Sequence, residues 1–197
     1  MSNMTNYLAK VLEVPAERLS LCSVQYQVKK VSKGELLLQY GEICRNTFFV
    51  DKGLLRMFSI DKNGKEHIIQ FAPENWLIGD RSSLYFSEKS NYYIEAVEDS
   101  EVSVLQRDFF NKLLEEFPNS IEKNDLILQK HVKSLQDRIN SLLGETAEER
   151  YLKFVKMYPD LMLRVPQWMI ASYLGITPES LSRVRKELAK KNFITDK

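Results

Sequence analysis

Short apolar runs separated by glycines fill the first half of the chain. Between about residues 29 and 105 these runs are rich in Val, Ile, Phe, Tyr and Leu, and glycines interrupt them at positions 34, 41, 53, 64 and 79. Runs of this length bounded by turn residues predict β-strands, and their number predicts a β-sandwich or barrel. Asn63-Gly64 lies between apolar runs at 54–60 and 67–71, and this dipeptide predicts a tight hairpin in which both residues have positive φ.

Helical patterns flank the β region. Residues 5–14 predict a short helix, and from Arg107 to Leu143 glycine is absent. Apolar residues in this second segment recur at steps of four and three, at Leu128, Val132, Leu135, Ile139 and Leu142. A helix packed on its own domain has this pattern, and so does a helix that pairs with its copy in a parallel two-stranded coiled coil. We expect the second arrangement, which makes these five residues the predicted dimer interface.

Another helix begins just after Gly144, which we expect to end the preceding one. Thr146 is followed three residues later by Glu149, the spacing of a capping box at a helix start. Residues 142–146 therefore form the predicted linker to a carboxyl-terminal domain.

The segment from Gln167 to Lys186 fits a helix-turn-helix. Ala171 is small where the two helices meet, and Gly175 fits the turn. Five apolar residues suit the inner face of the pair: Ile170, Leu174, Ile176, Leu181 and Val184. Thr177 can cap the second helix, and Pro178 suits its first turn. The alternative is a plain α-hairpin whose charged residues are solvated.

The residues left on the outside of the second helix have the chemistry to contact DNA. The amino-terminal part of such a helix meets base edges in the major groove. Arg183 can donate two hydrogen bonds to guanine, and Glu179 can accept one from cytosine. Arg185 and Lys191 add positive charge for phosphates. The predicted DNA-binding residues are Thr177, Glu179, Ser180, Ser182, Arg183, Lys186 and Lys190.

Composition narrows the remaining function classes. The net charge is only +1, so attraction for DNA must be local. Cys22 and Cys44 lie far apart in sequence, which argues against zinc, iron–sulfur and disulfide frameworks, so we expect no metal and no cofactor. The chain has no secretion signal and no apolar run that would span a bilayer, so a cytoplasmic protein with no membrane partner is expected.

Residues 178–186, PESLSRVRK, resemble the recognition helix of the Crp/Fnr family of bacterial transcription regulators, whose Fnr branch carries an E-x-x-S-R signature. Here the signature is Glu179, Ser182 and Arg183. Residues 41–80, GEICRNTFFVDKGLLRMFSIDKNGKEHIIQFAPENWLIGD, resemble the family's cyclic-nucleotide-binding-type β-roll. The resemblance runs from about residue 20 to 193. It implies a homodimer that binds an inverted-repeat site in double-stranded DNA and regulates transcription, with RNA polymerase as a possible further partner.

The fold class implied is α+β, in three parts. We expect a double-stranded β-helix (jelly-roll) sensor domain at 1–106, a dimerisation helix and hinge at 107–144, and a winged-helix-like helix-turn-helix domain at 145–197. The chain reads NFITDK after the recognition helix, so the wing is expected to be reduced or missing.

The sensor domain departs from the members that bind cyclic AMP. Those members hold the nucleotide with a Gly-Glu pair and, about ten residues later, an Arg-Ser pair. Here the first pair is Gly79-Asp80, and Ser90-Asn91 replaces the second. Without the arginine, an anionic phosphate loses its main charge partner, although Arg81 and Lys89 are near enough in sequence to substitute. Cyclic AMP is therefore not the expected effector.

A different ligand, or none, remains open for this region. The tentative effector pocket comprises Asp80, Arg81, Ser82, Ser83, Ser90, Asn91 and Tyr92. Tyr92 and Tyr93 can line a site for an uncharged or aromatic molecule, or they can simply fill the former pocket. The effector thus has no predicted identity.

Two other function classes deserve comparison. A protein-interaction module of the same fold would also fit the near-neutral charge and the missing wing, whereas the E-x-x-S-R signature favours DNA. An enzyme has little support, because the sequence has no nucleophile elbow, P-loop or paired-histidine metal motif.

Overall fold

The computed structural model describes residues 3–22 and 24–195. The chain divides into two compact units, Met1–Lys130 and His131–Lys197. The division falls inside one long helix, α5 (Ile121–Gly144). The first part of this helix, through Lys130, belongs to the first unit, and the rest belongs to the second. The expected domain limits at 106 and 144 remain predictions.

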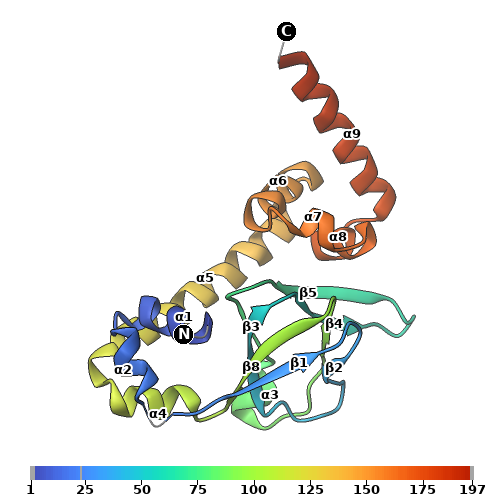
Figure 1. Cartoon of the computed structure of the whole chain (residues 1–197). Coiled ribbons are helices and arrows are strands. Elements are labelled where there is room, and N and C mark those ends of the chain that lie inside the picture. The colour runs from blue at the N-terminus through green and yellow to red at the C-terminus, as the bar shows by residue number, and fades with distance from the viewer. Residues whose placement is uncertain (1–2, 23, 196–197) are drawn as a thin grey trace. The chain divides into compact units, whose positions relative to one another are not determined.

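The amino-terminal unit contains two four-stranded antiparallel sheets (Figure 1). The first has the order β1 (Gln27–Val31), β8 (Ser100–Gln106), β3 (Asn46–Lys52) and β6 (Leu77–Ile78). The second has the order β2 (Leu36–Leu38), β7 (Tyr93–Ala96), β4 (Leu55–Ile60) and β5 (Glu66–Ala72). The predicted jelly-roll is therefore confirmed.

Apolar side chains from both sheets form the core between them. Val50 and Val102 from the first sheet, and Leu55 and Ile94 from the second, are fully buried in one cluster. Strands whose alternate residues meet between two sheets bury one face of each sheet, which is the main source of stability for this architecture.

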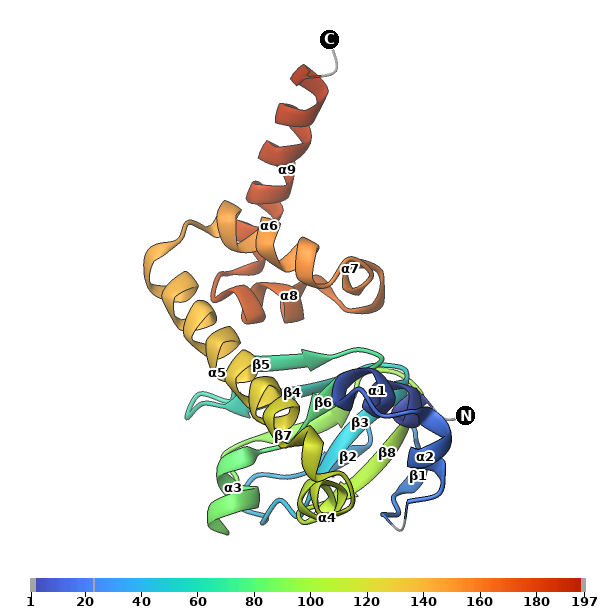
Figure 2. The same ribbon diagram turned by 90° about the vertical axis from the view of Figure 1, so that its left-hand side faces the viewer.

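Helices cover the outer face of the first sheet (Figures 1 and 2). These are α1 (Asn3–Leu12), α2 (Ala16–Ser20) and α4 (Phe109–Glu116), and they pack on Phe49 and Leu105. The start of α1 is tied to β3, because Asn3 Nδ2 donates to the Asp51 carbonyl at 2.7 Å. The Asp51 carboxylate accepts from Ser103 Oγ at 2.6 Å.

The hairpin at Asn63-Gly64 differs from the prediction. The strands β4 and β5 are where we expected them, and Ile60 pairs with Glu66. Gly64 has a φ of 80°, but Asn63 is not among the residues with positive φ. The loop instead spans residues 61–65, and its Asp61 carboxylate accepts from the N–H groups of Asn63 and Lys65. This aspartate satisfies the turn's donors, so a two-residue turn with two left-handed residues is not needed.

The helices of the carboxyl-terminal unit follow α5 in quick succession. They are α6 (Ala147–Met157), α7 (Leu161–Arg164), α8 (Gln167–Leu174) and α9 (Pro178–Thr195). Thr146 and Glu149 form the predicted capping box at the start of α6. Within the described part of this unit no strand follows α9, which continues as helix through residues 193–195.

The segment expected to form the dimerisation helix is more broken than its pattern indicated. Residues 109–116 form α4, and a 3-10 turn (Pro118–Ser120) separates it from α5. Pro118 begins that turn, and a proline disfavours a helix that runs through it without a break.

Over the described residues, no helix is both long and apolar enough to cross a membrane.

Candidate nucleic-acid interface and effector region

Helices α8 and α9 are joined by the turn of a helix-turn-helix. Gly175 lies at the end of α8 with a φ of 66°, a left-handed conformation that glycine adopts without steric cost. Ile170, Ala171 and Leu181 have no exposed surface, so the predicted inner face does hold the two helices together.

Thr177 caps the second helix rather than projecting freely. The Ser180 N–H donates to Thr177 Oγ1 at 3.2 Å, which satisfies one of the unpaired donors at the start of α9. The pKa of Glu179 is lowered, first by its own backbone N–H and then by Thr177. Glu179 is therefore ionised at neutral pH, and an ionised carboxylate can only accept hydrogen bonds.

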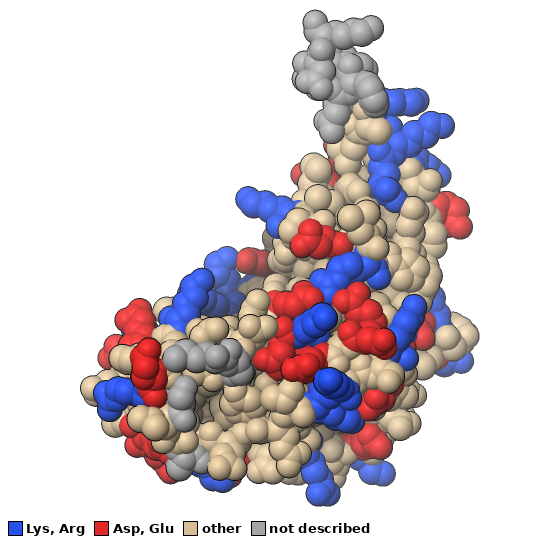
Figure 3. Space-filling model, viewed as in Figure 1, with Lys and Arg blue, Asp and Glu red and all other residues tan. Residues whose placement is uncertain are grey.

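The outer face of α9 carries the remaining predicted contacts. Glu179, Ser182, Arg183, Lys186 and Lys190 are exposed, and Ser180 and Arg185 are partly buried. Figure 3 shows Lys and Arg gathered along α9, whereas both signs of charge are mixed over the sheets. The structure therefore brings the predicted residues onto one accessible helix.

Lys191 is the exception among the predicted basic residues. Its Nζ donates to both carboxylate oxygens of Glu148, at 2.8 and 2.9 Å. This contact with α6 raises the lysine's pKa. Lys191 thus has an intramolecular anion beside it, and a phosphate would have to compete with that anion.

The residues that align with the family's nucleotide-binding pairs form hydrogen bonds with one another. Asp80 is buried and caps α3 (Arg81–Phe86), accepting from the Ser83 N–H at 3.2 Å. Ser90 Oγ donates to the second oxygen of the same carboxylate at 2.7 Å. The Tyr92 N–H in turn donates to Ser90 Oγ at 3.1 Å. The polar groups that would meet a ligand are therefore partnered inside the protein.

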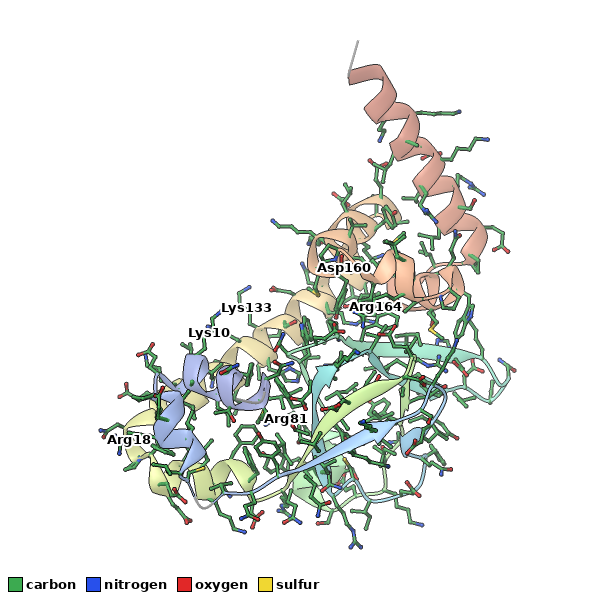
Figure 4. The ribbon with its side chains drawn as sticks, in the orientation of Figure 1. Lys10, Arg18, Arg81, Lys133, Asp160 and Arg164 are labelled. Carbon is green, nitrogen blue, oxygen red and sulfur yellow. The ribbon has the colours of Figure 1, made fainter. Side chains whose placement is uncertain are left out.

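The other residues of the tentative pocket point elsewhere. Arg81, Ser82 and Asn91 are exposed, and the Arg81 guanidinium lies 5.2 Å from the centre of the Tyr85 ring on the same helix (Figure 4). Tyr92 packs against the core between the sheets. Asp80, Ser83 and Ser90 thus converge, and Tyr92 joins them through its backbone, whereas Arg81, Ser82 and Asn91 are exposed.

One participant in this network had no signal in the sequence. The Cys44 N–H donates to Ser83 Oγ at 2.8 Å, and Ser83 Oγ donates to the Glu88 carbonyl at 2.6 Å. Burial raises the pKa of the Cys44 thiol. Backbone hydrogen bonds that join Gly41 and Glu42 to Ser90 hold this segment beside the network.

The predicted dimer seam on α5 is open to solvent. The exposed fractions are 38% for Leu128, 41% for Val132, 46% for Leu135, 58% for Ile139 and 40% for Leu142. Five large apolar side chains on one stripe of one helix thus form a partly exposed apolar surface.

Comparison with known proteins agrees with the geometry. Residues 28–117 match the model of the cyclic nucleotide-binding domain. The chain is 24% identical over 180 residues to the fumarate and nitrate reduction regulatory protein of Yersinia pestis, covering 86% of this chain and 71% of the relative. It is 24% identical over 190 residues to the regulatory protein HlyX of Actinobacillus pleuropneumoniae, covering 91% and 78%. The chain is therefore similar, over most of its length, to regulators of the Crp/Fnr type.

Solved structures support the same fold. FixK2 from Bradyrhizobium japonicum has a TM-score of 0.72 at 20% identity, covering 85% of this chain and 86% of that one. The catabolite activator protein of Thermus thermophilus has a TM-score of 0.54 at 21% identity, covering 89% and 84%. The two relatives named above are regulatory proteins and not enzymes.

Proposed function

We propose that the chain is a homodimeric transcription regulator that binds an inverted-repeat DNA site through α9 and does not respond to cyclic AMP. The observation that carries the proposal is the exposed polar and basic face of α9, built on a buried helix-turn-helix contact. In this proposal residues 1–106 sense a signal, 107–144 dimerise and 145–197 bind DNA.

Base recognition is assigned to the first turns of α9. Arg183 is exposed on the second turn, and its planar guanidinium can donate two bonds to guanine O6 and N7. Glu179 is ionised and one turn earlier, so it can accept from the cytosine amino group. Pro178 cannot donate a hydrogen bond to a base. One base position is therefore expected to be less strongly specified.

Phosphate contacts are assigned to Lys186 and Lys190, which are exposed farther along the same helix. Lysine acts on phosphate mainly as a point charge, without base selectivity. These residues are therefore expected to contribute affinity that falls as salt rises.

Dimerisation is assigned to the exposed stripe of α5. Its spacing places Val132 and Ile139 at the a positions and Leu128, Leu135 and Leu142 at the d positions, an arrangement that favours two parallel strands. A two-fold dimer presents two copies of α9, which matches the symmetry of an inverted repeat.

The effector assignment rests on the bonds of Asp80. In the family's nucleotide-binding pattern an arginine pairs with the cyclic phosphate, whereas here Ser90 stands at that position and already donates to Asp80. An added phosphate would meet a buried carboxylate with no guanidinium beside it, which is unfavourable.

The DNA assignment is tested by selection from a library of random duplexes, followed by gel-shift titration of the enriched sequences at several salt concentrations. We expect enrichment of an inverted repeat and an affinity that falls steeply with salt. Enrichment of no sequence, with equal retention of all duplexes, would reject sequence-specific binding. It would favour the alternative of a protein-interaction module.

The effector assignment is tested by calorimetric titration with cyclic AMP. We expect no heat of binding for the wild-type chain and no change in DNA affinity when the nucleotide is added. Saturable binding that strengthens DNA affinity would overturn this part of the proposal and leave the DNA assignment intact.

A further inference from the structure

Helix α5, which carries the exposed seam, also contacts the helix-turn-helix through Arg138. The Arg138 guanidinium carbon lies 3.7 Å from the centre of the Tyr173 ring. Its Nη2 donates to the Tyr173 carbonyl oxygen at 3.1 Å. Tyr173 is the penultimate residue of α8, where carbonyl groups lack partners within the helix and the negative end of the helix dipole favours a cation. One side chain therefore contacts both the ring and the backbone of α8.

The ring that Arg138 covers is itself firmly held. Tyr173 packs edge-on against Tyr158, with centroids 5.8 Å apart and planes at 87°. It also contacts Phe154, with centroids 5.4 Å apart. Tyr158 and Phe154 are almost fully buried, and burial raises the pKa of Tyr158 far above its ordinary value, so its hydroxyl stays neutral. Arg138 thus contacts a ring that packs on two almost fully buried side chains.

A second contact follows one turn along α5. Leu142 lies so near the helix-turn-helix turn that a Cβ added to Gly175 would be 3.1 Å from Leu142 Cδ2. The Leu142 carbonyl accepts from Arg150 Nη1 at 3.1 Å. Residues four apart share a helix face, so Arg138 and Leu142 present one face of α5 to the end of α8 and its turn.

We propose that Arg138 is a positioning residue that fixes how α9 is held relative to the α5 seam, and thereby sets the half-site spacing that the dimer accepts. The inference rests on the proposed function and refines it. Half-sites of a two-fold site lie about one helical turn apart, roughly 34–36 Å. Rotation of the helix-turn-helix about α5 would move each Arg183 out of register with its base, although neither Arg183 nor the seam had changed.

The test uses two variants and a control in the full-length chain. Arg138→Ala removes the contact, and Arg138→Lys keeps the charge but not the planar group that stacks on the ring. Lys133→Ala is the control: it removes a cation from the same helix, and Lys133 pairs at 2.7 Å with Asp137 on α5 itself (Figure 4).

The first measurement needs no DNA. Spin labels placed by non-canonical amino acids at Ser134 on α5 and Lys190 on α9 report their separation by pulsed electron resonance, with unlabelled chain added in excess to remove contributions between subunits. We expect a narrow distribution in wild type and Lys133→Ala, a broad or shifted one in Arg138→Ala, and an intermediate one in Arg138→Lys. An unchanged distribution in Arg138→Ala would overturn the proposal.

The second measurement uses a duplex enriched by the wild-type chain and a copy with the half-sites moved apart by about two base pairs, which rotates one half-site by roughly 70°. Wild type and Lys133→Ala should prefer the original spacing. In Arg138→Ala we expect that preference to shrink about tenfold, the scale of a lost cation–π contact and charged hydrogen bond.

The two measurements separate the two hypotheses. If wild type enriches no duplex, the proposed function fails, and the label distances still decide the role of Arg138. If Arg138→Ala does not fold, Arg138→Lys supplies both readouts, and a preference equal to that of wild type together with an unchanged distance distribution would reject the positioning role.

Discussion

Arg183 is the residue whose chemistry most directly tests the DNA interface. Its guanidinium is exposed on α9, and each bidentate contact to guanine is worth about 1–3 kcal/mol of discrimination. Arg183→Ala should therefore weaken binding to a selected site by that amount and relax base preference at one position in each half-site. Gel-shift titration against single-base variants of the site measures this.

Lys190→Ala is the matched comparison for Arg183→Ala, because both side chains are exposed on α9. Loss of a phosphate contact should weaken binding to all duplexes about equally and reduce the salt slope by about one. A base-selective defect in Lys190→Ala, or none in Arg183→Ala, would contradict the assignments.

Asp51 supplies a pH-dependent prediction. Burial raises its carboxyl pKa, opposed by its hydrogen bond from Ser103. Above the ordinary value of 3.8, the unfolded chain releases this proton before the folded chain does. The contribution of Asp51 to the free energy of unfolding is therefore fullest below that value and is lost as pH rises through the raised pKa.

Asp51→Asn keeps an acceptor for Ser103 and cannot ionise. The melting temperature of this variant, minus that of wild type, should therefore increase from about pH 4 to about pH 7. Thermal denaturation across that range measures the difference. A constant difference would show that Asp51 has no raised pKa in the folded chain.

At the residue scale, the sequence predicts which side chains can contact DNA, but it does not predict which side chains pair with one another inside the protein. The helix-turn-helix register and the resemblance to the E-x-x-S-R signature predict Glu179 and Arg183 as contact residues, and both side chains are exposed on α9. The pairing of Lys191 with Glu148, and of Ser90 with Asp80, could not be predicted, because both join segments whose proximity depends on the tertiary fold. Arg81, one of the two residues considered as substitutes for the missing arginine, is exposed and contacts Tyr85 on its own helix.

At the element scale, the turn between α8 and α9 gives a separate test. Gly175 has a φ of 66°, and an added Cβ would crowd Leu142 at 3.1 Å. Gly175→Ala should therefore lower the free energy of unfolding by more than the approximately 1–2 kcal/mol that a left-handed residue costs alone. Chemical denaturation measures this loss.

Gly64→Ala is the control for that substitution. Its φ is 80°, but nothing lies within 4 Å of an added Cβ. This variant should show the backbone cost without the crowding. Equal losses in the two variants would mean that Leu142 moves aside freely and that the contact between α5 and the turn is loose.

Elements with strong local sequence signals were predictable. The turn at residues 61–65 was not, because its form depends on a side chain that accepts hydrogen bonds from the backbone. The capping box at Thr146, the strands around residues 54–60 and 67–71, and the helix-turn-helix were all confirmed. The two-residue hairpin was wrong, because Asp61 accepts the N–H groups of a longer loop. The break between α4 and α5 was missed, although Pro118 was a signal for it.

At the scale of the whole molecule, the seam predicts the oligomeric state. Leu135→Lys combined with Ile139→Lys places two charges on the stripe where the largest exposed fractions occur, 46% and 58%. We expect monomers by sedimentation, with much weaker binding to a two-fold site, because each half-site would then be bound singly.

Leu163→Lys is the matched control for the seam substitutions. Leu163 is 94% exposed on α7 and lies off the seam, so the same chemical change there should leave the dimer intact. If the double variant also sediments as a dimer, the subunits associate through another surface.

The exposed apolar stripe of α5 also has a genetic consequence. Subunits made together in one cell would exchange partners through it, so a chain with Arg183→Ala would enter mixed pairs with normal chains. At equal expression and random pairing only about one quarter of the pairs would carry two intact reading helices, and the defect would be dominant. Adding Leu135→Lys and Ile139→Lys to the same chain would keep it out of those pairs and make the defect recessive.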